Sequence, residues 1–113
     1  MHKLVFFVPE AHAESVKDAV FQAGAGRYDR YDRCSWQTPG LGQFRPLEGS
    51  NPYLGRPGEV ETVAELRVEM VCRDEAVRDA LRALLDAHPY EEPAYEVYRI
   101  RTAEDFPARP GTV

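Results

Sequence analysis

The sequence has few cysteines, no cluster of basic residues and no long apolar run. Cys34 and Cys72, the two cysteines among 113 residues, lack C-x-x-C spacing, so we expect reduced thiols and no disulfide framework. No apolar stretch approaches the ~20 residues of a membrane-spanning helix, and the first ten residues lack the features of a signal peptide. We therefore expect a cytoplasmic protein that does not contact membranes. The formal net charge of −5 disfavours nucleic-acid binding, which needs clustered Lys and Arg.

The length of 113 residues is typical of one domain, and hydrophobic periodicity predicts most of its elements. A continuous apolar run predicts a central strand, strict alternation predicts the longest strand, and apolar positions at helical spacing predict two helices. Gly24 suits a left-handed helix C-cap and Asp74 suits an N-cap. The predicted elements are strand 4–8, helix 11–23, strand 60–72, helix 75–88 and strand 94–100.

The middle of the chain gives weaker signals. Residues 28–37 alternate, which predicts a strand, although neither face is clearly apolar. Thr38-Pro39-Gly40 predicts a turn, and 41–47 a short returning strand. Residues 48–59 are rich in Gly and Pro, which predicts a long loop that could act as a lid or arm.

The order β-α-β-(β)-β-α-β predicts an α+β fold, a ferredoxin-like βαββαβ sandwich with two helices on one face of an antiparallel sheet. We place this single domain at residues 1–101 and a C-terminal tail, pinned at Phe106, at 102–113. Two helices cover only one face of such a sheet. A second copy of the chain would cover the other face, which predicts a homo-oligomer.

Three stretches carry a resemblance to a known family. They are G-A-G-R-Y with C-S-W at 24–36, G-L-G-Q-F-R-P at 40–46 with the glycines and prolines after it, and A-H-P-Y-E-E-P-A-Y at 87–95. Over residues 1–101 the chain resembles the domain inserted in YqfO-type members of the NIF-three-like family, also called GTP cyclohydrolase one type two homologues. We expect a stand-alone form of that domain. Pro89-Tyr90-Glu91 with Pro93 also resembles the CutA proteins.

The resemblance implies a CutA-like, PII-like fold and an assembly habit, since CutA proteins form trimers. CutA-like relatives imply divalent-cation binding, and PII-like relatives imply small-ligand sensing at subunit clefts. The dinuclear metal site of the large family members lies in flanking domains that have no counterpart here, so their metal-dependent hydrolase activity does not transfer. These implications are analogies at the level of the fold.

The segment His88-Pro89-Tyr90-Glu91-Glu92-Pro93 is the main candidate site. One imidazole and two carboxylates in a rigid turn suit a divalent ion such as zinc or copper, with His88 and Glu91 as ligands. Symmetry copies would have to complete the ligand set. Alternatively, His88 caps the preceding helix and Tyr90 packs at an interface. We also include Trp36 and Phe44 among the ligand-binding candidates.

Other conspicuous residues have structural interpretations. We expect both cysteines on strands as core residues, and Gly24-x-Gly26 and Gly40-x-Gly42 in turns. His2 and His12 are expected at the surface, and the glutamates at 59, 61, 65 and 69 on a solvated face. An aromatic group predicts self-association: Tyr28, Tyr31, Trp36, Phe44 and Tyr53.

These features favour a non-enzymatic binding, regulatory or assembly module that acts as a small oligomer, a trimer or a dimer. Its subunit clefts would bind a metal or small ligand beside His88, Tyr90, Glu91 and the 40–58 loop. Its partners would be further copies of itself or a NIF-three-like protein. The alternative is an enzyme, a metal-assisted hydrolase that uses His88 with Glu91 or Glu92.

Overall fold

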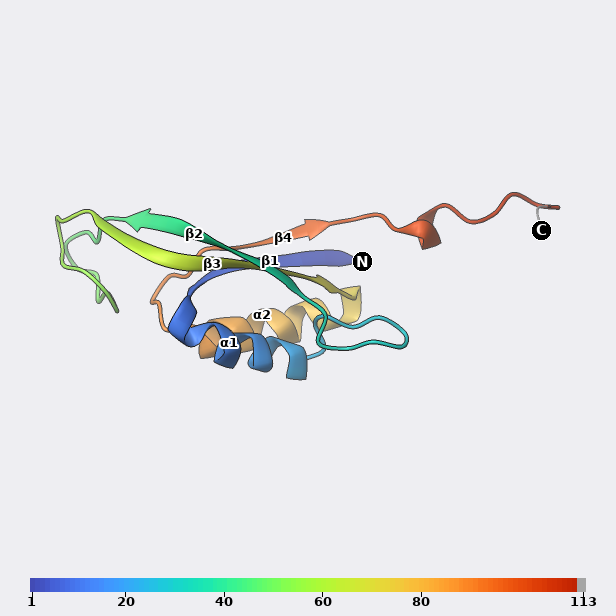
Figure 1. Cartoon of the computed structure of the whole chain (residues 1–113), viewed down its shortest axis with the longest axis horizontal. Coiled ribbons are helices and arrows are strands. Elements are labelled where there is room, and N and C mark those ends of the chain that lie inside the picture. Colours follow the sequence, from blue (N-terminus) through green and yellow to red (C-terminus); the bar gives the residue numbers. More distant parts are fainter. Residues whose placement is uncertain (112–113) are drawn as a thin grey trace.

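The computed structural model describes residues 1–111 and contains a four-stranded sheet with two helices on one face (Figure 1). The sheet order is β2-β3-β1-β4, and every neighbouring pair is antiparallel. This confirms the α+β ferredoxin-like fold. In chain order the elements are β1 (His2–Pro9), α1 (Glu10–Gln22), β2 (Trp36–Phe44), β3 (Glu61–Cys72), the 3₁₀ turn η1 (Asp74–Ala76), α2 (Val77–Ala87), β4 (Tyr95–Arg99) and the 3₁₀ turn η2 (Ala103–Asp105).

The core lies between the sheet and the two helices. In β1 the alternate residues Leu4, Phe6 and Val8 face the helices, as period-2 strand geometry requires. Val5, on the opposite face, is also fully buried, so the apolar run at 4–8 is covered as a central strand should be. The rest of the core comes from β3, α1 and α2, and its fully buried members there are Val16, Val20, Val68, Cys72 and Leu84.

The two predicted helix ends have different outcomes. Gly24 follows α1 at φ +109°, in the region that favours glycine, so the predicted C-cap is confirmed. The predicted N-cap at Asp74 is wrong, because its side chain makes no capping hydrogen bond. Asp74 Oδ1 instead lies 2.7 Å from both the Met1 amine and His2 Nδ1. These hydrogen bonds lower the pKa of the Asp74 carboxyl and join the N-terminus to the start of η1.

The prediction for the middle of the chain is partly wrong. Residues 24–35 form a loop, and β2 then runs without a break through the expected turn at Thr38-Pro39-Gly40. Residues 28–35 have no apolar face to bury, so they gain nothing from joining the sheet. Pro39 is tolerated because β2 is an edge strand. Cys34 therefore lies half-buried in this loop and not on a strand, whereas Cys72 is in the core as expected.

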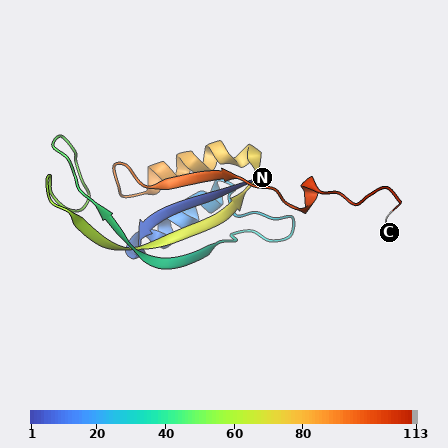
Figure 2. The same ribbon diagram turned by 90° about the horizontal axis from the view of Figure 1, so that it is seen from above.

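Two segments give the molecule its length of 64 Å against 23 and 22 Å in the other directions. The end of β2 and the start of β3 project beyond the helices. They are joined by residues 45–60, which we call the arm loop (Figures 1 and 2). The tail leaves the opposite end of the sheet. Phe106, the residue expected to pin the tail, is 62% exposed and lies outside the core, and its ring contacts only the last residue of the predicted domain, Arg101, whose Cζ is 4.2 Å from the ring centre. Predicted tail residues 112–113 lie outside the described residues.

Among residues 1–111, none of the helices is long and apolar enough to cross a bilayer.

Candidate functional site

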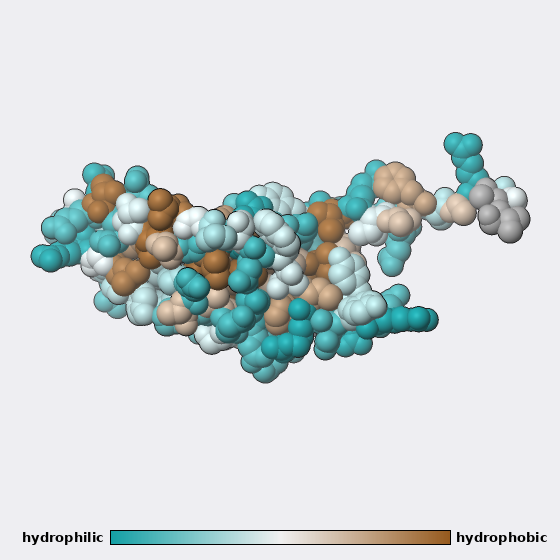
Figure 3. Space-filling model, viewed as in Figure 1, coloured by the Kyte–Doolittle hydropathy of each residue, from teal (hydrophilic) through white to brown (hydrophobic). Residues whose placement is uncertain are grey.

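An open groove of about 600 Å³ lies between the arm loop and the turn that joins α2 to β4. Its sides come from segments far apart in the sequence: the end of β1, residues 40–44 of β2, the first part of the arm loop, β3 and residues 90–94. Apolar surface is exposed among polar side chains at this end of the molecule (Figure 3). Most small-ligand sites are concave and largely apolar with a few polar groups, and this groove has that character.

Four aromatic side chains line the groove, and we call three of them, Phe44, Tyr53 and Tyr90, the aromatic cluster. The ring centres of Phe44 and Tyr90 are 6.0 Å apart, and those of Tyr53 and Tyr90 are 6.1 Å apart, both in tilted arrangements. These distances are typical of interacting aromatic pairs. The cluster brings together the end of β2, the arm loop and the α2–β4 turn.

Two hydrogen bonds hold the arm loop in place. The Tyr53 hydroxyl and Nε2 of His12 on α1 are 2.8 Å apart, and the two rings meet edge to face. The Asn51 N–H donates to Glu91 Oε2 at 3.0 Å. The arm loop is therefore attached to both α1 and the α2–β4 turn, which keeps the Tyr53 ring beside the groove.

The Tyr90 hydroxyl is buried and makes no hydrogen bond of good geometry within residues 1–111, but the Glu65 carboxylate lies near enough to accept one from it. Burial raises the pKa of this phenol, and the nearby negative charge of Glu65 raises it further, so the group is neutral near pH 7. The Glu65 side chain crosses Gly42 on the neighbouring strand, where a methyl group would overlap the carboxylate. Glycine at position 42 therefore gives the Glu65 carboxylate its place in the groove.

His88 is buried and hydrogen-bonded through both ring nitrogens. Its Nε2–H donates to the Phe7 carbonyl at 2.7 Å, and the Tyr90 N–H donates to Nδ1 at 3.1 Å. Burial lowers the pKa of the imidazole, against the opposing effect of the Phe7 carbonyl. A neutral ring in this tautomer joins β1 to the α2–β4 turn.

The metal site at His88 and Glu91 stays a prediction, and two observations count against it. Binding a metal through His88 would break one of these two hydrogen bonds. Within residues 1–111, no three His, Cys, Asp or Glu side chains lie close enough together to hold a metal ion.

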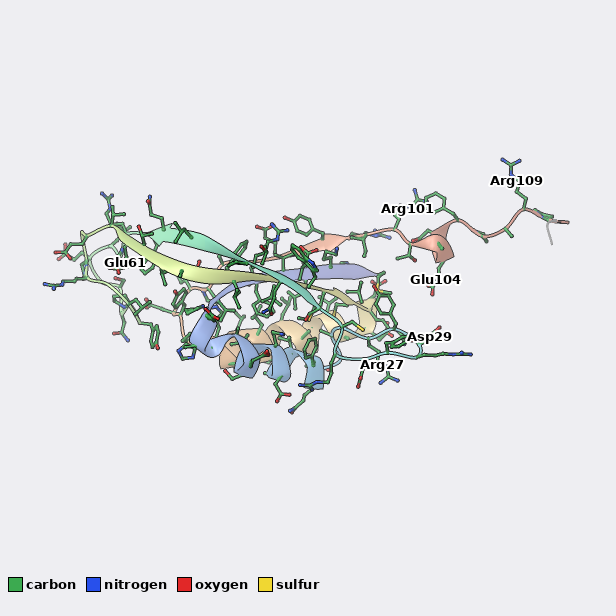
Figure 4. All side chains as sticks on the ribbon, viewed as in Figure 1. Arg27, Asp29, Glu61, Arg101, Glu104 and Arg109 are labelled. Atoms are coloured by element: carbon green, nitrogen blue, oxygen red, sulfur yellow. The ribbon has the colours of Figure 1, made fainter. Side chains whose placement is uncertain are left out.

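The structure brings together four of the predicted ligand-binding residues and separates a fifth. Phe44, Tyr90, Glu91 and Glu92 all line the groove. Trp36 lies at the opposite end of β2, eight residues from Phe44 or about 26 Å along a strand, and it is 61% exposed. The predicted self-associating aromatic group is divided in the same way. Figure 4 shows that Arg27 and Asp29, in the loop that precedes Trp36, lie far from Glu61 at the start of β3.

Sequence reasoning missed two side chains of the groove, because it placed Phe7 in the strand core and Glu65 on a solvated face. It included Tyr53 only as part of the 40–58 loop and among the residues for self-association. Strand alternation did indicate the correct face for Glu65, because Glu65 and its neighbour Leu66 must lie on opposite faces of the sheet and Leu66 faces the helices. The register that places Glu65 opposite Gly40 and beside Gly42 comes only from the β2–β3 pairing.

The comparisons with known proteins point in one direction. No family model matches the chain. The chain is 45% identical over 100 residues to the GTP cyclohydrolase 1 type 2 homolog of Mycobacterium tuberculosis, a match that covers 88% of this chain and 26% of that protein. The chain thus spans about a quarter of the length of the curated relatives it matches.

Solved structures agree with the sequence comparison. A Bacillus cereus protein related to NIF3 is 40% identical, with a TM-score of 0.77 over 89% of this chain and 26% of that chain. The CutA of Pyrococcus horikoshii is 16% identical, with a TM-score of 0.67 over 94% of this chain and 91% of that chain, and it shows the shared fold. The chain is a CutA-like domain homologous to one segment of the NIF3-like GTP cyclohydrolase 1 type 2 homolog proteins.

Proposed function

We propose that this chain is a non-enzymatic binding module that works within a small homo-oligomer, and that its ligand site is the groove beneath the arm loop. The observation that carries the proposal is the groove itself. Its volume of about 600 Å³ falls in the range of small-molecule sites, and it combines apolar walls with a few polar groups. The Tyr90 hydroxyl, which makes no hydrogen bond of good geometry within residues 1–111, supports a ligand there, since buried polar groups normally have hydrogen-bond partners.

The groove does not have the arrangement that nucleophilic catalysis requires. The cysteines of the chain do not line it. Of the two imidazoles that contact its aromatic cluster, His88 has both nitrogens hydrogen-bonded, and His12 Nε2 is hydrogen-bonded to the Tyr53 hydroxyl. Burial also raises the pKa of the Cys72 thiol, which disfavours the reactive thiolate. These observations favour binding over the metal-assisted hydrolase alternative.

The outer face of the sheet supports the oligomer. This face carries the exposed aromatic rings of Trp36 and Tyr98, beside the charged network of Lys3, Arg67 and Glu69. Aromatic rings and arginine are enriched at interfaces between subunits, and this face carries both. The implied trimer of the CutA-like relatives is the assembly we expect, and a NIF3-like protein is the second partner to test.

Light scattering on the purified protein, with elemental analysis of the same peak, tests the assembly. We expect a trimer without stoichiometric zinc or copper. A monomer would contradict the oligomer, and one bound metal per subunit would contradict the assignment of His88 to a structural role.

A thermal-shift screen of small metabolites and divalent metals tests the ligand site. We expect at least one organic ligand whose stabilisation is lost in Phe44→Ala, which removes a groove wall. Stabilisation should persist in Val60→Ala, because Val60 is an exposed arm-loop residue outside the groove. A ligand that stabilises both variants equally would place the site elsewhere.

A further inference from the structure

We propose that the groove binds an organic cation of the substituted-ammonium class. This inference rests on the proposed function and specifies the chemistry of its ligand. The observation behind it is the pairing of an aromatic cluster with carboxylates in one groove: Phe44, Tyr53 and Tyr90 lie there with Glu65, Glu91 and Glu92. Ring faces attract cations through their quadrupoles, and nearby carboxylates add a direct charge attraction.

The three rings are arranged as walls and not as a closed stack. Tyr90 has three neighbouring rings, His88 at 4.9 Å and Phe44 and Tyr53 at about 6 Å, all in tilted arrangements. Phe44, Tyr53 and Tyr90 all line the groove, so a cation bound in the groove would contact aromatic surface from one side. The hydrogen bond from Tyr53 to His12 holds the outer ring in position.

The charges in the groove favour a cation over an anion. Glu65 forms no ion pair within residues 1–111, and it lies half-buried where charge interactions are less screened. Of the two arginines, Arg67 is already paired with Glu69 at 3.3 Å and lies over the Phe7 ring, whereas Arg45 is exposed. Lys3 also pairs with Glu69, so the network of Lys3, Arg67 and Glu69 keeps one positive charge. Three carboxylates of the groove therefore face that charge and the charge of Arg45, and the balance stays negative. A phosphate-rich ligand would meet net repulsion here.

The Tyr90 hydroxyl supplies a hydrogen-bonding group for the same ligand. Its oxygen is buried and makes no hydrogen bond of good geometry, and the group stays neutral because burial, the charge of Glu65 and the nearby Glu65 acceptor all disfavour the phenolate. An N–H or O–H group of the bound cation would satisfy the Tyr90 oxygen and bring its positive charge toward Glu65. The site would therefore select ligands that combine a positive charge with a hydrogen-bond donor.

A matched pair of probes tests this inference on the intact chain. Choline and 3,3-dimethyl-1-butanol have nearly the same shape, but only choline is charged. NMR titration should show choline binding about tenfold or more tightly than the alcohol, with shifts at groove residues. Glu65→Gln and Phe44→Leu should each weaken choline binding about three- to tenfold, the range expected when one charge or one ring face is lost. Val60→Ala is the control and should bind choline as the native chain does.

The outcomes separate the inference from the proposed function. Equal binding of the alcohol, or tighter binding of ATP at groove residues, would overturn the cation inference and leave the groove as a ligand site. If no probe shifts the NMR signals of the groove residues in the folded native chain, both the cation inference and the proposed ligand site would be contradicted. Selective choline binding that Glu65→Gln weakens would support both.

Discussion

Replacing His88 with alanine removes a buried side chain that connects the end of β1 to the α2–β4 turn. The ring is 6% exposed and donates to the Phe7 carbonyl at 2.7 Å while it accepts from the Tyr90 N–H at 3.1 Å. Leaving two buried backbone groups without these partners costs ~1–3 kcal/mol, and the cavity left by the ring adds to that cost. We expect His88→Ala to lower the free energy of unfolding by about 2–4 kcal/mol.

Urea denaturation at pH 7 measures this loss, with linear extrapolation of the unfolding free energy. His88→Gln is the matched control, because its amide offers one donor and one acceptor at a similar reach. We expect it to retain at least ~1 kcal/mol more stability than His88→Ala. A His88→Ala variant within ~0.5 kcal/mol of the native chain, the range of ordinary surface substitutions, would refute the structural role.

The pH dependence gives an independent check on the same residue. Burial lowers the pKa of folded His88 below its unfolded value of about 6.5, so the unfolded state binds the proton first as pH falls. Stability from this group is complete above pH ~6.5 and falls by up to ~1.4 kcal/mol per pH unit below it, until the folded pKa is reached. This component should be absent in His88→Gln. Zinc that stabilises the native chain but not His88→Gln would instead support a metal site.

Three other substitutions test the packing. Leu84→Ala should lower the free energy of unfolding by ~2–5 kcal/mol because Leu84 is fully buried, whereas Leu85→Ala at its 44% exposed neighbour should cost much less, both measured by urea denaturation. Gly42→Ala should cost ~0.5 kcal/mol or less, because the new methyl meets only the end of the flexible Glu65 side chain, which can move aside, and a double-mutant cycle with Glu65→Ala should show that this small cost depends on Glu65. Tyr90→Phe should be neutral or stabilising by up to ~1 kcal/mol in thermal unfolding, because its buried hydroxyl makes no hydrogen bond of good geometry within residues 1–111; a loss above ~1 kcal/mol would show that it does donate one, to Glu65.

Local patterns predict those parts of the fold whose residues bury a continuous apolar face. Three segments each predict one element, because their apolar positions repeat with the period of the positions that the element buries. They are the run at 4–8, the alternation at 60–72 and the stripe at 75–88. The segment 28–47 has no such face. Its alternation at 28–35 therefore predicts a strand where the structure has a loop, and Pro39 predicts a turn where the structure has the edge strand β2. Edge position is a property of the sheet order, which the local sequence does not contain.

The sequence by itself determined the α+β order, the core residues and the candidate segment at 88–92. Only the tertiary structure decided the role of these residues. His88 and Phe7 are 81 positions apart, and their hydrogen bond makes His88 a buried connection between β1 and the α2–β4 turn. Likewise, Phe44, Glu65 and Tyr90 meet because β2 pairs with β3 and the α2–β4 turn lies beside them. Strand pairing and helix packing create such long-range contacts, and the periodicity of a single segment does not predict which other segments it will contact.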